Sequence, residues 1–233
     1  MRTVAVVLAG GAGQRFGGSM PKQLQRLAGR TVLEHSVAAF QRAPGVDEIL
    51  VVMAPRFTGH ARQVLDAGGY GKVTSVIEGG GGRPDSTRRA IAALGTDAGE
   101  CNVLFHDAAR PLLDQRIIAD CVRALATDQA IGVAVPSSDT MVEVSDGIVT
   151  GMPRRDALQR CQTPQGFRLS VIRRAYQLAD ADPQFAAFAA TDDCGIVLRY
   201  LPAVPIRVVP GSERNIKITF PSDLDIAEAL LRK

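Results

Sequence analysis

The chain has 233 residues, of which 46% are hydrophobic and 22% are charged, as expected for one folded α/β domain with a sizeable core. The net charge of +3 and the aromatic content of 5% argue against a nucleic-acid-binding protein. We find no apolar run near the ~18 residues of a membrane span, and no signal-peptide pattern. The four cysteines are scattered without a C-x-x-C pair, which favours reduced thiols in the cytoplasm over disulfides or a zinc site.

The first predicted strand leads into a glycine-rich loop. Residues 4–8 form an unbroken apolar run, which is typical of a parallel strand covered on both faces. The glycines within residues 10–13 can leave backbone N–H groups bare, so that a polyphosphate can approach the main chain. Arg15 and Lys22 then add two cations. The stretch therefore suits a nucleoside triphosphate.

Two common glycine motifs do not fit this loop. A Walker A motif ends in Gly-Lys-Ser/Thr, whereas Lys22 lies between Pro21 and Gln23. The dinucleotide motif G-x-G-x-x-G, counted from Gly11, would end at Phe16. The remaining alternative to a phosphate site is a glycine-rich surface loop with solvated charges.

Strand and helix patterns then alternate. Thr31 and Glu34 have the spacing of a capping box at the start of a helix, which Pro44 and Gly45 end. Strands are expected at residues 48–53, 72–77, 131–135 and 206–210 and in residues 102–111, which end in charge, with helices at 58–67, 88–94, 114–127, 169–180, 194–201 and after 221. This alternation predicts an α/β fold with a doubly wound, mostly parallel, Rossmann-like sheet.

Two strand ends carry candidate ligand-binding residues. Gly79 to Gly82 precede a helix, so a base or ribose can come close, and Ser86 can cap that helix or contact the ligand. The alternative for Arg83 and Ser86 is a capped helix with a surface arginine. Asp107 and Arg110 follow a strand, where open α/β sheets bind ligands, although they could instead form a structural salt bridge.

Residues 141–149 interrupt the βα alternation. They have the pattern of a β-hairpin with an Asp-Gly turn. An isolated two-stranded hairpin is only marginally stable in water, so we expect this one to pack against something. Further on, Pro164 is expected to end a segment before the helix at 169–180.

Four motifs resemble those of a known enzyme family. Leu8-Ala9-Gly10-Gly11-x-Gly13-x-Arg15, followed by Pro21-Lys22-Gln23, is similar to the signature of nucleotidyltransferases that join a sugar or polyol phosphate to a nucleotide. Within this group the chain looks most like the cytidylyltransferases of 2-C-methyl-D-erythritol 4-phosphate and ribitol 5-phosphate. Residues 106–111 (HDAARP), 162–165 (QTPQ) and 215–219 (NIKIT) extend the resemblance over nearly the whole length.

The resemblance implies one nucleotidyltransferase domain over residues 1–233. Within it, residues 138–157 would form a protruding arm that makes a homodimer and completes the acceptor site of the neighbouring copy. A hairpin that folds back on its own chain would produce the same sequence pattern.

The resemblance also implies three groups of site residues. Those that stabilise the reacting phosphates are Arg15, Lys22 and Lys217. Those that bind CTP are Ala9, Gly10, Gly11, Ala12, Gly13, Gly80, Arg83 and Ser86. Those that bind the acceptor are Asp107, Arg110, Thr140, Arg155, Thr163, Thr191 and Asp192. We assign no catalytic role to His106, which we expect to be a hydrogen-bonded structural histidine.

The implied reaction is attack of a polyol phosphate oxygen on the α-phosphorus of CTP, with release of pyrophosphate. Two unit charges ~4 Å apart repel by about 4 kcal/mol at an effective dielectric constant near 20, so positioning and fixed positive charge must supply most of the catalysis. Mg²⁺ or another divalent cation would be held mainly by the nucleotide phosphates.

The acceptor is harder to predict than the use of CTP. Residues 106–111 favour methylerythritol phosphate, whereas residues 8–11 and 191–194 lean toward the ribitol phosphate relatives. A more distant alternative is a nucleotide-binding module without catalysis. Lys22, Lys217 and Asp107 are all present, which disfavours that alternative.

Overall fold

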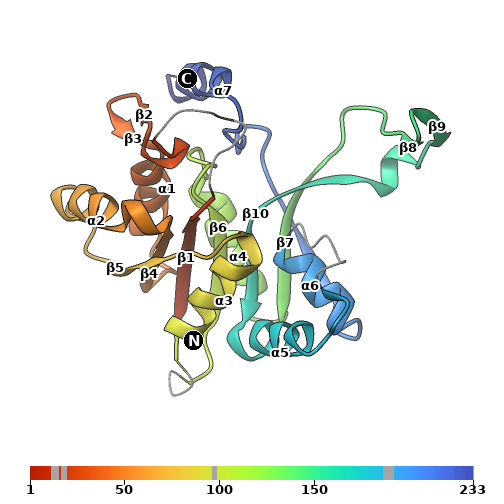
Figure 1. The fold of residues 1–233 in the computed structure, drawn as a ribbon, viewed down its shortest axis with the longest axis horizontal. Coiled ribbons are helices and arrows are strands. Elements are labelled where there is room, and N and C mark those ends of the chain that lie inside the picture. The colour runs from red at the N-terminus through yellow and green to blue at the C-terminus, as the bar shows by residue number, and fades with distance from the viewer. Residues whose placement is uncertain (12–15, 17–19, 96–98, 186–191, 233) are drawn as a thin grey trace.

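A computed structural model describes residues 1–11, 16, 20–95, 99–185 and 192–232 (Figure 1). The strands are β1 Thr3–Ala9, β2 Arg26–Leu27, β3 Arg30–Thr31, β4 Glu48–Met53, β5 Val73–Glu78, β6 Asn102–Asp107, β7 Ala130–Pro136, β8 Glu143–Ser145, β9 Ile148–Gly151, β10 Gln159–Arg168 and β11 Ile206–Pro210. The helices are α1 Val32–Gln41, α2 Thr58–Ala67, α3 Arg83–Ala93, α4 Gln115–Ala124, α5 Leu169–Asp180, α6 Asp193–Tyr200 and α7 Ser222–Leu231. Short 3-10 helices are η1 Lys22–Leu24, η2 Pro55–Phe57 and η3 Arg155–Ala157.

Seven strands form the central sheet, in the order β11-β7-β10-β6-β1-β4-β5. Its two faces are both covered by helices (Figure 1). Along β1, Ala5 and Val7 pack in a core cluster with α1, α2 and α4, whereas Val4, Val6 and Leu8 pack in a second cluster with α3, α5 and α6. Side chains alternate between the faces of a strand, so a strand covered on both faces is apolar throughout. The predicted doubly wound, mostly parallel sheet is confirmed.

β10 differs from the expectation for its sequence. Instead of ending at Pro164, the strand continues through it and pairs antiparallel with both β6 and β7. The register shifts between Cys161 and Gln165, which is how a central strand can contain a proline that donates no hydrogen bond. The prediction that a segment ends at Pro164 was wrong because the partner strands on both sides outweigh the local break.

The predicted capping box of α1 and the predicted hairpin turn are both present in the structure. Thr31 and Glu34 form the predicted capping box, with Thr31 N–H donating to Glu34 Oε2 at 2.7 Å and Glu34 N–H donating to Thr31 Oγ1 at 3.1 Å. Asp146 and Gly147 both have positive φ, 51° and 79°, as a tight hairpin turn between β8 and β9 requires. None of the helices in the described part of the chain has the length and apolarity that crossing a membrane requires.

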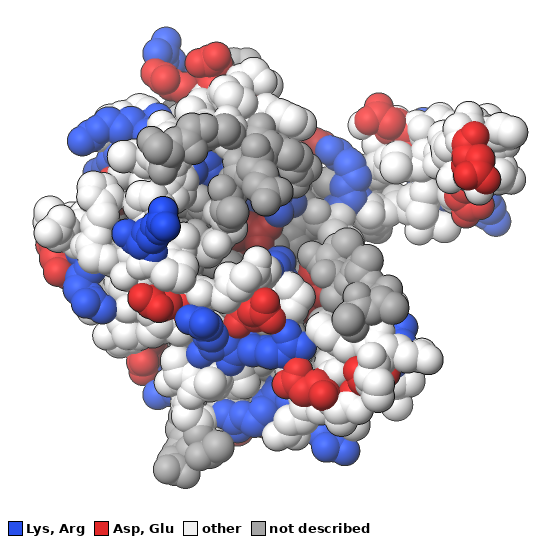
Figure 2. Space-filling view, viewed as in Figure 1, with Lys and Arg blue, Asp and Glu red and all other residues white. Residues whose placement is uncertain are grey.

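The hairpin β8–β9 stands away from the body of the molecule (Figure 1). It forms its own two-stranded sheet and is joined to the central sheet by the chain that leaves β7 and returns into β10. Val144, Ile148 and Val149 are all more than half exposed on it. Figure 2 shows that uncharged residues cover much of this arm.

Candidate functional site

A cleft of about 520 Å³ opens beyond the carboxyl ends of β1 and β6. Most of its polar lining belongs to the residues that the sequence singled out. These lining residues are Gly10, Gly11, Lys22, Arg83, Ser86, Asp107 and Lys217. They come from segments that are far apart in the chain, and the parallel strands deliver them to one edge of the sheet.

One side of the cleft is made of main chain. A Cβ on Gly10 would lie 2.9 Å from Ser86 Oγ, and a Cβ on Gly79 would lie 2.9 Å from the same oxygen and 3.3 Å from the Cα of Gly10. The loop after β1 and the loop before α3 therefore touch through their backbones, and a side chain at either position would separate them.

Ser86 holds this contact in place but does not cap α3. The helix begins after Gly82, and Ser86 lies within its first turn. Its hydroxyl accepts a hydrogen bond from Gly80 N–H at 3.2 Å, and the residue is 3% exposed. Of the two roles considered for Ser86, capping is wrong, because the helix starts three residues earlier than the serine; contact with CTP stays a prediction. Ala9, also predicted to contact CTP, places its side chain in the core below the loop.

Lys22 joins this side of the cleft to the C-terminal segment. From η1, its Nζ donates a 2.6 Å hydrogen bond to the carbonyl of Ile218. The predicted cations Lys22 and Lys217 thus border one cleft although they are almost the whole chain apart. The predicted site residues Ala12, Gly13, Arg15 and Thr191 lie outside the described residues.

Gln23 was not among the predicted site residues. Its side chain is 3% exposed, lines the cleft and donates from Nε2 to the Gly11 carbonyl at 3.5 Å. Its Oε1 is buried without a hydrogen-bond partner. The only sequence signal was its place directly after Lys22 in the Pro-Lys-Gln motif.

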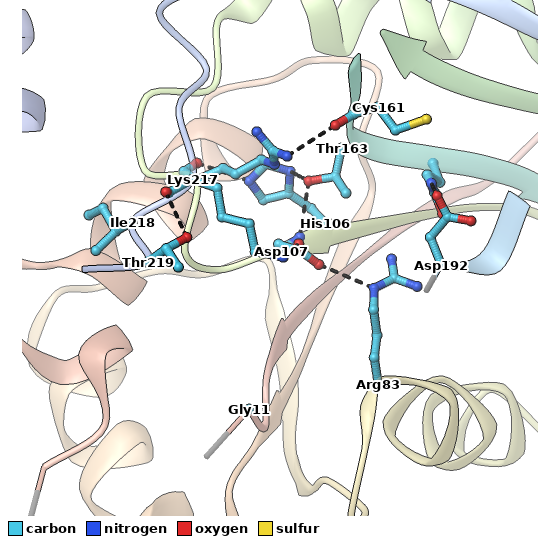
Figure 3. Close-up of polar contacts among 12 residues, drawn as sticks. Gly11, Arg83, His106, Asp107, Cys161, Thr163, Asp192, Lys217, Ile218 and Thr219 are labelled. Atoms are coloured by element: carbon cyan, nitrogen blue, oxygen red, sulfur yellow. Dashed lines mark hydrogen bonds and ion pairs between the residues drawn. The ribbon is translucent and has the colours of Figure 1, made fainter. Parts of the chain in front are cut away.

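The opposite side of the cleft is charged. Asp107, the last residue of β6, accepts from Lys217 Nζ at 2.6 Å through Oδ2 and from Arg83 Nε at 3.3 Å through Oδ1 (Figure 3). Burial by itself would raise the pKa of Asp107, but Arg83 and Lys217 outweigh it and hold that pKa well below its usual range. The carboxylate is therefore ionised at neutral pH and fixes the position of the Lys217 ammonium.

Arg110 does not form the salt bridge with Asp107 that we considered as an alternative. It donates instead to two main-chain carbonyls, those of Asn215 at 2.7 Å and Cys161 at 3.2 Å. These bonds tie β10 and the C-terminal segment to the loop after β6. The role of Arg110 toward an acceptor phosphate stays a prediction.

His106 and Thr163 form a buried hydrogen-bond chain behind Asp107 (Figure 3). Asp107 N–H donates to Thr163 Oγ1 at 3.1 Å, and Thr163 Oγ1 lies 2.9 Å from His106 Nδ1. His106 Nε2 lies 3.1 Å from the Arg110 carbonyl. Burial lowers the pKa of His106 to about 4, so the ring is neutral, with Nε2 donating to that carbonyl and Nδ1 accepting from the hydroxyl.

This pattern agrees with a structural role for His106. The hydrogen bond to His106 also occupies the hydroxyl of Thr163, a residue that is 4% exposed. To donate to a phosphate, as predicted, Thr163 would first have to release His106. Its role as an acceptor ligand stays a prediction.

Three further predicted acceptor residues lie away from the described lining of the cleft. Asp192 caps α6, since its Oδ1 accepts from Gly195 N–H at 2.8 Å. Its other oxygen, Oδ2, accepts from Gln165 Nε2 at 2.8 Å. Arg155 donates to Thr140 Oγ1 at 3.2 Å within the arm and its base. Within one chain, the structure does not bring this last pair to the cleft.

Known proteins are similar to this chain in sequence over nearly its whole length. The sequence model of the 2-C-methyl-D-erythritol 4-phosphate cytidylyltransferase (IspD) family matches residues 3–233. The enzyme of that name from Thermobifida fusca is 52% identical, over 99% of this chain and 94% of the relative. A bifunctional ribulose 5-phosphate reductase/CDP-ribitol pyrophosphorylase from Haemophilus influenzae is 37% identical, over 99% of this chain but 48% of the relative.

A solved structure agrees with the sequence comparisons. The crystal structure of 4-diphosphocytidyl-2C-methyl-D-erythritol synthase from Anaerococcus prevotii superposes with a TM-score of 0.85 at 28% identity, over 100% of this chain and 96% of that one. The sheet, the cleft and the matched sequence thus lead to one conclusion: the chain belongs to the 2-C-methyl-D-erythritol 4-phosphate cytidylyltransferase family.

Proposed function

We propose that this chain transfers CMP from CTP to 2-C-methyl-D-erythritol 4-phosphate, releasing pyrophosphate and serving isoprenoid precursor synthesis. The observation that carries the proposal is the meeting of two kinds of surface in one cleft. Gly10 and Gly11 offer a close main-chain approach, while Lys22 and Lys217 bring positive charge to the same space. Such a cleft suits the joining of two phosphorylated molecules.

The chemical step needs little proton transfer from the protein. An oxygen of the acceptor phosphate, already anionic at neutral pH, attacks the α-phosphorus of CTP. The bond from the α-phosphorus to the bridging oxygen breaks, and its electron pair leaves with pyrophosphate. Repulsion between the two polyanions is the obstacle, so we assign Arg15, Lys22 and Lys217 to offset the charge that gathers in the transition state.

A divalent cation fits this site as a partner of the nucleotide. Among the described residues, no three His, Cys, Asp or Glu side chains gather into a metal-binding cluster. The one carboxylate in the described lining, Asp107, is already paired with Arg83 and Lys217. Mg²⁺ is commonly held by substrate phosphates with few protein ligands. Bound in that way, it would neutralise part of the triphosphate charge.

Pyrophosphate release tests the reaction and the acceptor together. Purified protein with CTP and Mg²⁺ is assayed with methylerythritol phosphate, with ribitol 5-phosphate and with no acceptor. We expect release with methylerythritol phosphate at a kcat/KM at least tenfold above that with ribitol 5-phosphate. A preference for ribitol 5-phosphate would establish the alternative activity, and no release with either acceptor would favour a binding module.

We also propose that the arm makes a homodimer and that Thr140 and Arg155 serve the acceptor site of the partner copy. The exposed apolar side chains of β8 and β9 support this, because a bare two-stranded hairpin is marginal without a surface to pack on. Sedimentation of a Val144→Glu/Ile148→Glu variant tests it. We expect a dimer for the unmodified chain and a monomer for the variant. Leu198→Glu, on α6, is the control, since Leu198 is 65% exposed outside the arm.

A cytoplasmic location completes the proposal. CTP and the polyol phosphate are both multiply charged and do not cross a membrane unaided, so the enzyme must act in the compartment that holds them. Cell fractionation with an antibody against the chain would check this. Recovery in the membrane or extracellular fraction would contradict it.

A further inference from the structure

A row of buried side chains leads from α5 and α6 to the charged side of the cleft. Tyr176 Oη donates to Asp193 Oδ1 at 2.7 Å, and Arg83 Nη1 donates to Asp193 Oδ2 at 2.6 Å. Arg83 then reaches Asp107 through Nε at 3.3 Å. Tyr176 is 3% exposed and Asp193 is completely buried. Among the described residues that line the cleft, Asp193 contacts Arg83, through its guanidinium.

Asp193 is not needed to cap its own helix. It is the first residue of α6, but the side chain that accepts from the helix backbone belongs to Asp192. The N–H of Asp193 donates to Gln165 Oε1 at 3.0 Å. Both carboxylate oxygens of Asp193 therefore point to partners outside α6, and one of these partners lines the cleft.

Stability alone does not account for this buried ion pair. The free energy needed to remove two charges from water is about as large as the attraction between them. Proteins in which apolar residues replace such a pair are therefore often equally stable. What a buried pair does provide is a fixed geometry. Here the guanidinium is held from behind by the shorter bond, to Asp193, and meets Asp107 by the longer bond.

The two oxygens of Asp107 are divided between two cations. Arg83 Nε contacts Oδ1, and Lys217 Nζ contacts Oδ2 at 2.6 Å. A guanidinium that is free to turn prefers a forked pair with both oxygens of a carboxylate. Because Nη1 is bound to Asp193, the guanidinium is held so that only Nε reaches Asp107. Nη2, which would complete the fork with Nε, is buried without a hydrogen-bond partner, and the second oxygen of Asp107 remains for Lys217.

We propose that Asp193 is a positioning residue for the acceptor half of the site. It restrains Arg83 so that Asp107 can hold the Lys217 ammonium where the acceptor phosphate arrives. This inference rests on the proposed function, which assigns Lys217 to the reacting phosphates. Tyr176 supports the same geometry from the far side of Asp193.

Steady-state kinetics of Asp193→Asn test this inference. We expect the KM for the acceptor to rise at least tenfold, and by more than the KM for CTP, which Arg83 is also predicted to bind, because Arg83 turns onto both oxygens of Asp107 and displaces Lys217. Asp193→Glu keeps the charge and should restore the acceptor KM to within about threefold of the original. Tyr176→Phe should raise the same parameter by about threefold to fivefold.

Tyr200→Phe is a matched control. Tyr200 also lies on α6 and donates to an aspartate, Asp182, at 2.7 Å, but this pair lies outside the described lining of the cleft. Its removal should leave both KM values unchanged. Equal rises in the two KM values of Asp193→Asn, or an effect of Tyr200→Phe as large as that of Tyr176→Phe, would overturn the inference.

A crystal structure of Asp193→Asn separates this inference from the proposed function. We expect Arg83 to contact both oxygens of Asp107, and Lys217 Nζ to lie more than about 4 Å from them. An unmoved Arg83 would overturn the inference even if the unmodified enzyme showed no activity. If Asp193→Asn does not fold, the KM ratios of Tyr176→Phe and Asp193→Glu decide between the same two outcomes.

Discussion

The cleft has a glycine wall, formed by Gly10, Gly11 and residues 79–81, and a charged wall, formed by Arg83, Asp107 and Lys217. The glycine wall presents main chain, and its two loops touch because no Cβ keeps them apart. The charged wall presents side chains from three distant segments, and each cation is paired with a carboxylate. The shape of the glycine wall depends on the missing Cβ atoms of its glycines, and the geometry of the charged wall depends on ion pairs between its side chains. Mutations should therefore affect the two walls in different ways.

Lys22→Ala should have the largest effect. Lys22 spans from the segment after the glycine wall to the Ile218 carbonyl, next to the charged wall. Loss of a fixed donor for transition-state charge typically costs 10²–10³-fold, or about 2.7–4 kcal/mol, so we expect kcat to fall by roughly that factor. The melting temperature should stay within a few degrees. Stopped-flow or coupled pyrophosphate assays would measure the change.

Lys72→Ala is the matched control for Lys22→Ala. Lys72 also donates from Nζ to a main-chain carbonyl, that of Ala43 at 2.7 Å, but it lies outside the described lining of the cleft. We expect its kcat to be unchanged. Near-normal turnover in Lys22→Ala would remove Lys22 from the catalytic set.

His106, buried behind the charged wall, should make stability depend on pH. Its pKa in the folded chain is about 4, below the ordinary 6.5, so the unfolded chain binds the extra proton between these values. The stabilisation is complete above pH 6.5 and is lost as pH falls toward 4. Between pH 7.5 and pH 5 the free energy of unfolding should drop by about 2 kcal/mol from this group.

Urea unfolding at the two pH values checks the contribution of His106. In His106→Gln, whose amide can bond Thr163 and the Arg110 carbonyl without titrating, the drop should be smaller by that amount. The variant will be less stable throughout, so the comparison is between the two pH differences. Equal differences in the two proteins would show that folding does not lower the pKa of His106.

Gly10→Ala should have a smaller effect, confined to the glycine wall. The new Cβ would lie 2.9 Å from Ser86 Oγ and 3.5 Å from the Cα of Gly79, so the Ser86 hydroxyl, which accepts from Gly80 N–H, must shift. We expect the KM for CTP to rise about tenfold, because small displacements of a binding loop are costly, with the acceptor KM nearly unchanged.

A double-mutant cycle sharpens the Gly10 prediction. Ser86→Gly removes the oxygen that the new Cβ meets, so the double variant should be less impaired than the sum of the two single effects. Gly59→Ala is the control, since a Cβ on Gly59 meets nothing within 4 Å. Strict additivity would mean that the Ser86 hydroxyl is not the group that a side chain at position 10 disturbs.

Most of the glycine wall could be predicted because it is written in contiguous motifs. The apolar run of β1 and the glycines after it follow local rules of burial and backbone freedom, as do the capping box at Thr31 and the turn at Asp146. Even there, the sequence did not show that Gln23 is buried beneath Gly11, because the fold of η1 decides where that side chain points.

The amino-acid sequence by itself determined the α/β class, the main-chain approach at Gly10 and Gly11, and the family to which the chain belongs. Only the tertiary structure decided that β10 runs through Pro164, and that Asp193 is paired with an arginine 110 residues away. The physical reason is the distance along the chain over which each interaction acts. Backbone preference and apolar periodicity act within a few residues, whereas strand partners and the pairing of buried charges depend on which distant segments the sheet brings together.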